Sequence, residues 1–212
     1  MSDIALIFCK EMIQAFLDGR KTMTRRTRGL EVVNENPDKW VLFPSDGSGD
    51  FRFYSQSDDV IVRVKCRYPV GDRVYVKETW AVTQNYDGLK PSEIPHSSPI
   101  WWYADELEHV QWGHGRQRSA MFMPEWAARI WREITAVRCE RVQDIEKYPE
   151  DFKAEGYKPI MLNNPKGELV EFSCDSAWFE SLWDRLNSRK YPWKLNPWVW
   201  VLTLIDKKEA QE

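Results

Sequence analysis

The segment IALIFCKEMIQAFLDGRKTMTRRTR, residues 4–28, determines the first secondary-structure elements and carries a dense cluster of positive charge. Residues 4–9 are an apolar run rich in strand formers, and apolar residues then recur at helical spacing from Met12 to Leu17. This pattern predicts a strand followed by a helix. Gly19 stands where a helix C′ residue belongs, because a residue without Cβ adopts the left-handed conformation cheaply. We therefore expect the helix to end there.

The second part of this segment, residues 20–28, holds five cations and no acid, in a chain whose formal net charge is −3. Such a local concentration of positive charge is a ready anion site. A solvated basic turn, paired with surface carboxylates, is the plainer interpretation of a charge run. Its position between a glycine-terminated helix and the next strand favours side chains that gather on one side of a sheet and line a pocket.

The remaining pattern predicts an α+β protein. Between residues 40 and 80, short strand-like runs alternate with turn signals, which indicates a β-meander that curls into a barrel. Residues 81–121 lack sustained periodicity and are interpreted as a long excursion from the barrel. The elements expected after it are a helix from Pro124 through Trp131, a strand at 134–142, a short helix at 149–155 ended by Gly156, an amphipathic helix around 178–186, and a buried central strand at 198–205.

Composition bounds the class of protein. A chain of 212 residues with 12 Trp fits one domain, residues 1–212, with a large apolar core. No stretch approaches the ~20 apolar residues of a membrane span, and the N-terminus lacks the basic flank of a secretory signal, so we expect a cytoplasmic protein with no membrane partner. The four cysteines are far apart and are interpreted as reduced thiols. No phosphate-binding loop or metal motif is visible, which predicts no cofactor and no metal; the oligomeric state stays open.

Three motifs together resemble a known family. They are Gly19-Arg20-Lys21-Thr22-x-Thr24-x-Arg26, then Gly71-Asp72-x-Val74-x-Val76-x-Glu78, and then Ala154-Glu155-Gly156, followed by a Trp-rich final strand. This set is similar to the ASCH domain, and is closest to the longer ASCH proteins often found in phages and prophages. The resemblance covers most of residues 4–205, least well at about 30–68 and 81–121. It implies a mixed β-barrel like that of PUA and EVE domains, flanked by short helices, with insertions at those two places.

The resemblance also implies a function. PUA-like domains bind RNA or modified bases, and some small ASCH members are amidohydrolases that remove the acyl group of N4-acetylcytidine. Their catalytic Lys, Thr and Glu correspond by motif to Lys21, Thr24 and Glu155. The neighbouring polar side chains Arg20, Thr22, Arg25 and Arg26 are then candidates for binding the substrate. This chain is about twice as long as those hydrolases, and its insertions could reshape the cleft.

The chemistry of this set makes physical sense. A threonine hydroxyl needs a base to take its proton, and a lysine serves only if its pKa falls well below ~10.4. Neighbouring arginines and partial burial would disfavour the ammonium form of Lys21, and Glu155 could donate to the leaving amine or orient the amide. Residues three apart in a regular strand face opposite sides, so Lys21 and Thr24 can meet only across a turn or bulge.

Glu78 and three tryptophans are further candidates for the site. Glu78 could accept hydrogen bonds from the edge of a base, or could simply pair with Arg25 or Arg26. Trp80 and the pair Trp101-Trp102 are candidates for stacking on a base, whereas most other tryptophans are expected in the core.

Our leading hypothesis is therefore a protein that binds RNA or a modified nucleoside, with hydrolysis of an acylated cytidine as its activity. A non-catalytic reader of modified bases in DNA or RNA is the second hypothesis. A phage accessory protein that binds a host protein is the third.

Overall fold

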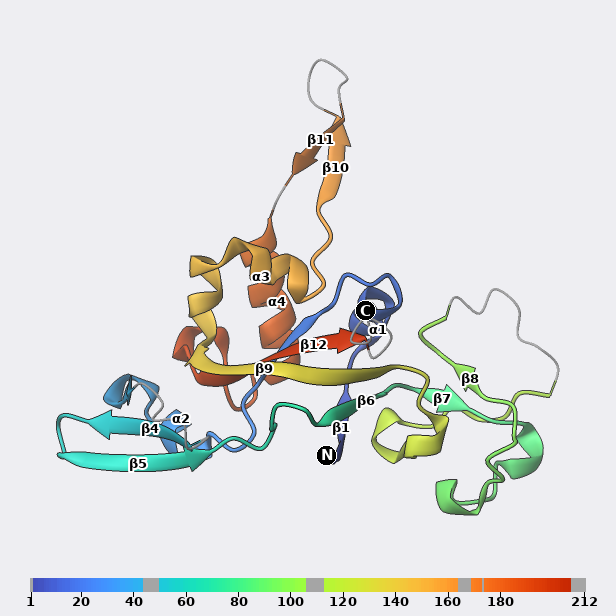
Figure 1. The fold of residues 1–212 in the computed structure, drawn as a ribbon. Coiled ribbons are helices and arrows are strands. Elements are labelled where there is room, and N and C mark those ends of the chain that lie inside the picture. The colour runs from blue at the N-terminus through green and yellow to red at the C-terminus, as the bar shows by residue number, and fades with distance from the viewer. Residues whose placement is uncertain (1, 44–49, 106–112, 164–168, 173, 207–212) are drawn as a thin grey trace. The chain divides into compact units, whose positions relative to one another are not determined.

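The computed structural model describes residues 2–43, 50–105, 113–163, 169–172 and 174–206 (Figure 1). The fold is α+β, as predicted, and its helices are short. The α-helices and strands are, in chain order, β1 Asp3–Ile7, α1 Lys10–Leu17, β2 Met23–Arg26, α2 Glu31–Asn34, β3 Val41–Phe43, β4 Asp50–Ser55, β5 Val60–Lys65, β6 Arg73–Lys77, β7 Trp80–Ala81, β8 Trp101–Trp102, β9 Trp131–Arg141, α3 Pro149–Ala154, β10 Ile160–Asn163, β11 Leu169–Phe172, α4 Asp175–Asn187 and β12 Trp198–Asp206.

The chain divides into two compact units, which are described separately. Unit 1 comprises Met1–Gly19, Gly71–Ile134 and Ile205–Glu212, and unit 2 comprises Arg20–Val70 and Thr135–Leu204. Strands β9 and β12 each run through both units. The prediction of a single domain stays a prediction.

In unit 1, strand β1 pairs in parallel with β6, and β6 pairs antiparallel with the first residues of β9. Helix α1 buries Met12, Ile13, Ala15 and Phe16 on one face, as its apolar spacing predicts. Gly19 has a φ of +70° and its N–H donates to the carbonyl of Phe16, so the helix ends there. The predicted strand, helix and stop are all confirmed.

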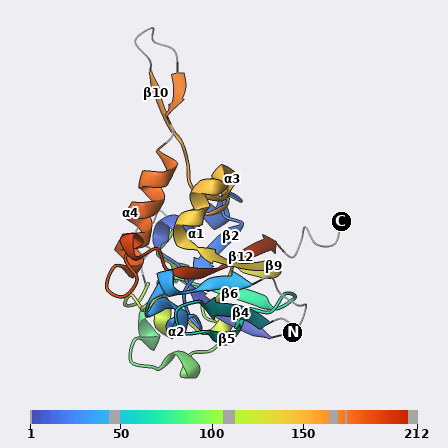
Figure 2. The same cartoon turned by 90° about the vertical axis from the view of Figure 1, so that its left-hand side faces the viewer.

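In unit 2, strand β12 lies between two layers. Val199 and Val201 belong to an apolar cluster with Phe152 of α3 and Phe179 of α4, and both helices lie on the same side of β12 (Figures 1 and 2). On the opposite face, the rings of Trp198 and Trp200 contact Phe53 and Phe51 of β4 in T-shaped pairs with centroids 5.1 and 4.7 Å apart. The predicted buried central strand is therefore confirmed, and these two layers explain why it is apolar on both faces.

The predicted barrel is the main correction. The large mixed sheet has the strand order β1-β6-β9-β12-β2, and within the described ranges it does not close. The meander is interrupted as well, because β3, β4 and β5 form their own antiparallel sheet, whereas β6 pairs with β1. That pairing joins residues about 70 positions apart, and local periodicity carries no signal for it.

The helices and strands of the second half are largely as predicted. The expected helices correspond to α3, which ends before Gly156 at φ +103°, and to α4. The helix expected from Pro124 to Trp131 is wrong. Only a 3-10 turn forms, at Glu125–Ala127, because the backbone of Trp131 already belongs to strand β9 and pairs with Tyr75.

Candidate functional site

The segment before β2 brings Lys21 to the end of helix α3. The N–H of Thr22 donates to the carbonyl of Ala154 at 2.8 Å, and the carbonyl of Thr22 accepts from Leu204 at 2.8 Å. Residues 20–22 are not part of the strand, which begins at Met23. Lys21 therefore lies in irregular backbone before the strand, and not in an unbroken strand with Thr24.

Lys21 and Glu155 form a buried ion pair. Lys21 Nζ lies 2.7 Å from Glu155 Oε2 and also donates to the carbonyls of Glu155, at 2.9 Å, and Met23, at 2.7 Å. Both residues are almost completely buried. Burial lowers the pKa of Lys21, and the positive charges of Arg25 and Arg26 act in the same direction, against the favourable effect of Glu155. The structure thus brings two of the three predicted catalytic residues together.

Arg25 is buried beside the same carboxylate. Its guanidinium donates to Glu155 Oε1 at 2.9 Å, to Glu140 Oε1 at 2.8 Å and to Asp151 Oδ2 at 2.6 Å. Burial works against the charged form, but these carboxylates outweigh it and raise the pKa of Arg25. A second arginine, Arg138, pairs with Glu140 and Asp151. We call Lys21, Arg25, Arg138, Glu140, Asp151 and Glu155 the charge cluster.

The sequence analysis missed three members of the charge cluster, namely Arg138, Glu140 and Asp151. A signal for two of them exists. Arg138 and Glu140 are two positions apart in a predicted strand, so their side chains lie on the same face. Charged side chains on a strand in the core need partners of opposite charge. Asp151 carries no such signal, because an acidic residue in the first turn of a helix is common.

Thr24 lies on the other side of β2. Met23 packs against the apolar cluster of α3 and α4, and the guanidinium carbon of Arg25 lies 5.6 Å from the ring centroid of Phe179. Because side chains alternate along a strand, Thr24 and Arg26 face away from those helices. Thr24 is buried and its backbone lies opposite Leu202 of β12. The predicted catalytic threonine is therefore separated from the Lys21–Glu155 pair by the strand itself.

The other side of β2 carries a second group of cations. Burial raises the pKa of the Tyr68 hydroxyl, while the nearby positive charges of Arg26, Arg28 and Arg67 oppose that shift. Arg28 and Arg67 are exposed and Arg26 is half-buried. These three arginines lie near enough to Tyr68 to act on the pKa of its hydroxyl. We call them the arginine group.

Arg20 and Thr22 are the remaining predicted substrate-binding residues of unit 2. Arg20 is half-buried and donates from Nη1 to the carbonyl of Gly156. Thr22 is exposed beside it. Neither position contradicts the predicted contact with a substrate, which stays a prediction.

In unit 1, Glu78 is bound by an arginine. Arg129 donates to Glu78 Oε1 from Nε at 2.9 Å and to Oε2 from Nη2 at 3.0 Å. Arg129 also pairs with Asp105 and lies over Trp102, 4.7 Å from the ring centroid. Burial raises the pKa of Glu78, although Arg129 opposes that shift. Glu78 is thus paired with Arg129, and the predicted pairing with Arg25 or Arg26 is wrong.

Trp80 does not offer a face to a base in this structure. It is completely buried in an apolar cluster with Ile94 and Met123, and Arg118 lies 5.6 Å from its ring centroid. A strand of only two residues holds it, paired with the half-buried Trp101 and Trp102. The prediction that Trp80 stacks on a base is corrected, because the apolar environment that the indole prefers is provided by the insertion around it.

No protein-family model, curated protein or solved structure matched the chain. The ASCH resemblance is therefore carried by the motifs alone. Among the described residues, no helix is both long enough and apolar enough to cross a membrane.

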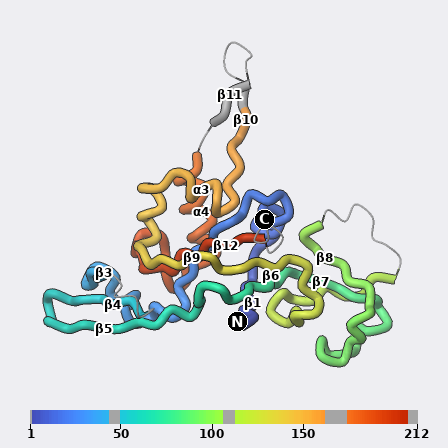
Figure 3. The backbone as a smooth tube through the Cα atoms, viewed as in Figure 1, coloured from blue at the N-terminus to red at the C-terminus, as the bar shows by residue number. Residues whose placement is uncertain are grey.

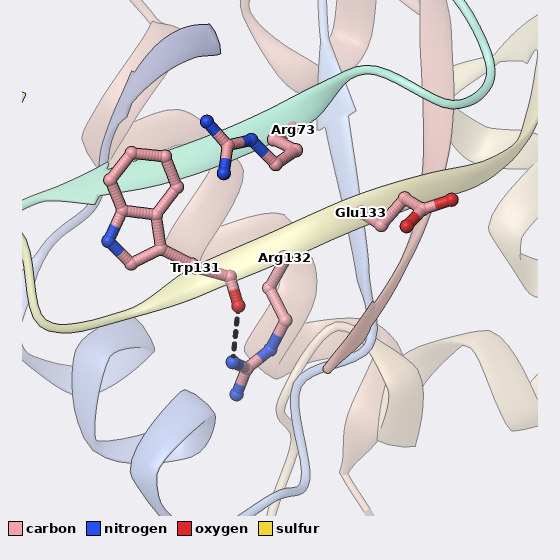
Figure 4. A pocket seen from close by; sticks show the side chains of 4 residues that line it. All are labelled: Arg73, Trp131, Arg132 and Glu133. Atoms are coloured by element: carbon pink, nitrogen blue, oxygen red, sulfur yellow. Dashed lines mark hydrogen bonds between the residues drawn. The ribbon is translucent and has the colours of Figure 1, made fainter. Parts of the chain in front are cut away.

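A separate pocket of about 220 Å³ lies in unit 1, lined by Arg73, Trp131, Arg132 and Glu133 (Figure 4). The guanidinium of Arg73 lies over the Trp131 ring, 5.0 Å from its centroid, and is also paired with Asp3. Arg132 donates to the Trp131 carbonyl at 2.8 Å. Both cations of the pocket are thus engaged with groups of the chain itself.

Proposed function

We propose that this chain binds RNA or a modified nucleoside, as an ASCH-like protein, through residues 20–28 and their neighbours. The observation that carries the proposal is the placement of four of the five cations of this segment. Lys21 and Arg25 pair with carboxylates inside the charge cluster, whereas Arg26 and Arg28 lie with Arg67 near Tyr68. Arginines gathered at one place support recognition of a phosphate, which cationic side chains contact.

The position of Thr24 favours binding without a threonine nucleophile. A hydroxyl on the opposite side of β2 from Lys21 cannot pass its proton to that amine, since proton transfer needs hydrogen-bond distance. The three acceptors of Lys21 Nζ all belong to the chain itself. These contacts support a reader of modified bases more than an acyl-transfer enzyme.

Binding can be tested with two RNA strands that differ only in one N4-acetylcytidine. The wild type is expected to prefer the acetylated strand, and Arg26→Ala/Arg28→Ala is expected to weaken binding and to reduce the salt slope by roughly 1.4, at about 0.7 per phosphate contact of a single strand. Arg189→Ala/Lys194→Ala removes two exposed cations elsewhere in unit 2 and serves as the matched control. Equal affinity of wild type and Arg26→Ala/Arg28→Ala would refute the proposal.

Hydrolysis of the acylated base is the second candidate, and the Lys21–Glu155 pair is the observation that favours it. An amine of lowered pKa at 2.7 Å from a carboxylate is an acid–base pair that could activate water once water replaces one of the carbonyl contacts of Lys21 Nζ. Water would add to the amide carbon, the C–N bond would break, and the exocyclic nitrogen would leave protonated, giving a carboxylic acid and cytidine.

The hydrolase candidate is tested by chromatographic detection of cytidine released from N4-acetylcytidine. Lys21→Met keeps the length of the side chain and removes the base, so turnover should fall by about 10²- to 10⁴-fold. Lys153→Met, an exposed position on the neighbouring helix, should leave turnover unchanged. Turnover that survives Lys21→Met in a folded variant would reject this assignment.

A further inference from the structure

Strands β3, β4 and β5 form a small antiparallel sheet in unit 2 (Figure 3). Its two faces carry chemically different side chains. One face carries Phe51 and Phe53, which pack on Trp200 and Trp198. Side chains alternate along each strand, so the residues between them form the opposite face. We call this opposite face the outer face. Its central positions, as the strand register aligns them, are Val41, Tyr54 and Ile61 in one row and Phe43, Arg52 and Arg63 in the next.

The outer face exposes apolar and aromatic groups that nothing in the described part of unit 2 covers. Val41 and Ile61 are each 59% exposed, and Phe43 is 44% exposed. The rings of Phe43 and Tyr54 are neighbours, with centroids 5.8 Å apart and planes at 78°. Large apolar side chains on a solvent-facing sheet mark a binding surface more often than a scattered single residue does.

Cations lie on one side of these rings, next to Phe43, whereas the hydroxyl of Tyr54 donates to Asp59 Oδ1 at 3.2 Å. Arg52 and Arg63 lie opposite each other on neighbouring strands, next to Phe43, and Lys65 follows two positions later on the same face, opposite Asp50. Among the described residues, Arg63 and Lys65 form no ion pair, and both are exposed.

We propose that the outer face binds single-stranded nucleic acid. Exposed aromatic rings on a sheet stack with unpaired bases of any sequence, while cations on the same surface contact the phosphates. The combination of rings and cations favours this occupant over a second protein, because an apolar protein interface is depleted of charge at its centre. The proposal concerns a surface other than residues 20–28 and does not depend on the function proposed above.

The test uses a short fluorescent uridine oligomer of about twelve nucleotides, with no modified base, and measures anisotropy at about 50 and 200 mM salt. The wild type is expected to bind. Arg63→Ala/Lys65→Ala should bind at least about tenfold more weakly at low salt and should show a salt slope smaller by roughly 1.4. Phe43→Ala should bind roughly 5- to 150-fold more weakly at both salt concentrations, because it removes stacking and no charge.

Arg189→Ala/Lys194→Ala again provides the control for net charge and should bind as the wild type does. The same oligomer annealed to its complement should bind more weakly, since paired bases cannot stack on the rings. The proposal is overturned if the wild type does not bind the oligomer, or if Phe43→Ala and Arg63→Ala/Lys65→Ala bind it as tightly as the wild type does. In that case, a self-association that Val41→Ser/Ile61→Ser abolishes would identify a second copy of the chain as the occupant of this face. These variants leave Arg26 and Arg28 intact, so failure here is distinct from failure of the proposed nucleoside site.

Discussion

Removing Arg25 should destabilise unit 2 more than any other single change in the charge cluster. Its guanidinium side chain is 1% exposed and contacts three carboxylates at 2.6–2.9 Å. In Arg25→Met, Glu155 keeps Lys21, and Glu140 and Asp151 share Arg138. The cluster then holds two cations for three anions, so one buried negative charge has no counterpart. Breaking a buried ion pair from one side costs about 3–5 kcal/mol.

The assay is urea unfolding at neutral pH, followed by circular dichroism and tryptophan fluorescence. For a chain of this size, losing about 3–5 kcal/mol of the free energy of unfolding corresponds to a decrease in Tm of roughly 6–20 °C, at about 2–4 °C per kcal/mol. Arg138→Met is the matched control, because its side chain is 39% exposed and solvent screens the charges it leaves. We expect it to cost less than half as much as Arg25→Met.

A double variant separates charge imbalance from lost packing. Glu140→Gln, added to Arg25→Met, restores two cations and two anions, so the double variant should be more stable than Arg25→Met alone. If it is less stable, or if Arg25→Met unfolds within about 1 kcal/mol of the wild type, the charge-balance reasoning fails.

Three further predictions concern backbone strain and titration. Gly19→Ala places a Cβ in open space but at a φ of +70°, and should lower the free energy of unfolding in urea by about 1–2 kcal/mol. Gly88→Ala is the control: its Cβ would also lie in open space, but its φ is not positive, so stability should change by less than about 0.5 kcal/mol. Because burial lowers the pKa of Lys21, the free energy of unfolding should rise as the pH increases from the folded-state pKa of Lys21 towards its unfolded-state value of 10.5. If Lys21→Met shows the same rise, Lys21 is not the group responsible for it. Because burial raises the pKa of Glu78, its contribution to stability is fully present below pH 4.5 and is lost as the pH rises through its folded pKa. Glu78→Gln should therefore remove that pH dependence from urea unfolding.

The sequence by itself determined the elements whose signals are local. The apolar spacing of residues 12–17, the glycine stops at Gly19 and Gly156, and the doubly apolar final strand each led to the element that is observed. The motifs also led to Lys21 and Glu155 before their 2.7 Å contact was known. These features depend on side-chain period and on backbone conformations that few residues can adopt.

Only the tertiary structure decided how these elements pair and which face each polar residue uses. The parallel pairing of β1 with β6 replaces the predicted barrel, and Arg138, Glu140 and Asp151 complete the charge cluster from other elements. Thr24 was assigned to the site by motif, yet strand β2 separates it from Lys21, because a strand that starts at Met23 alternates its side chains from there. Strand pairing and the point at which a strand begins are set by contacts between distant residues, and a linear sequence does not display those contacts.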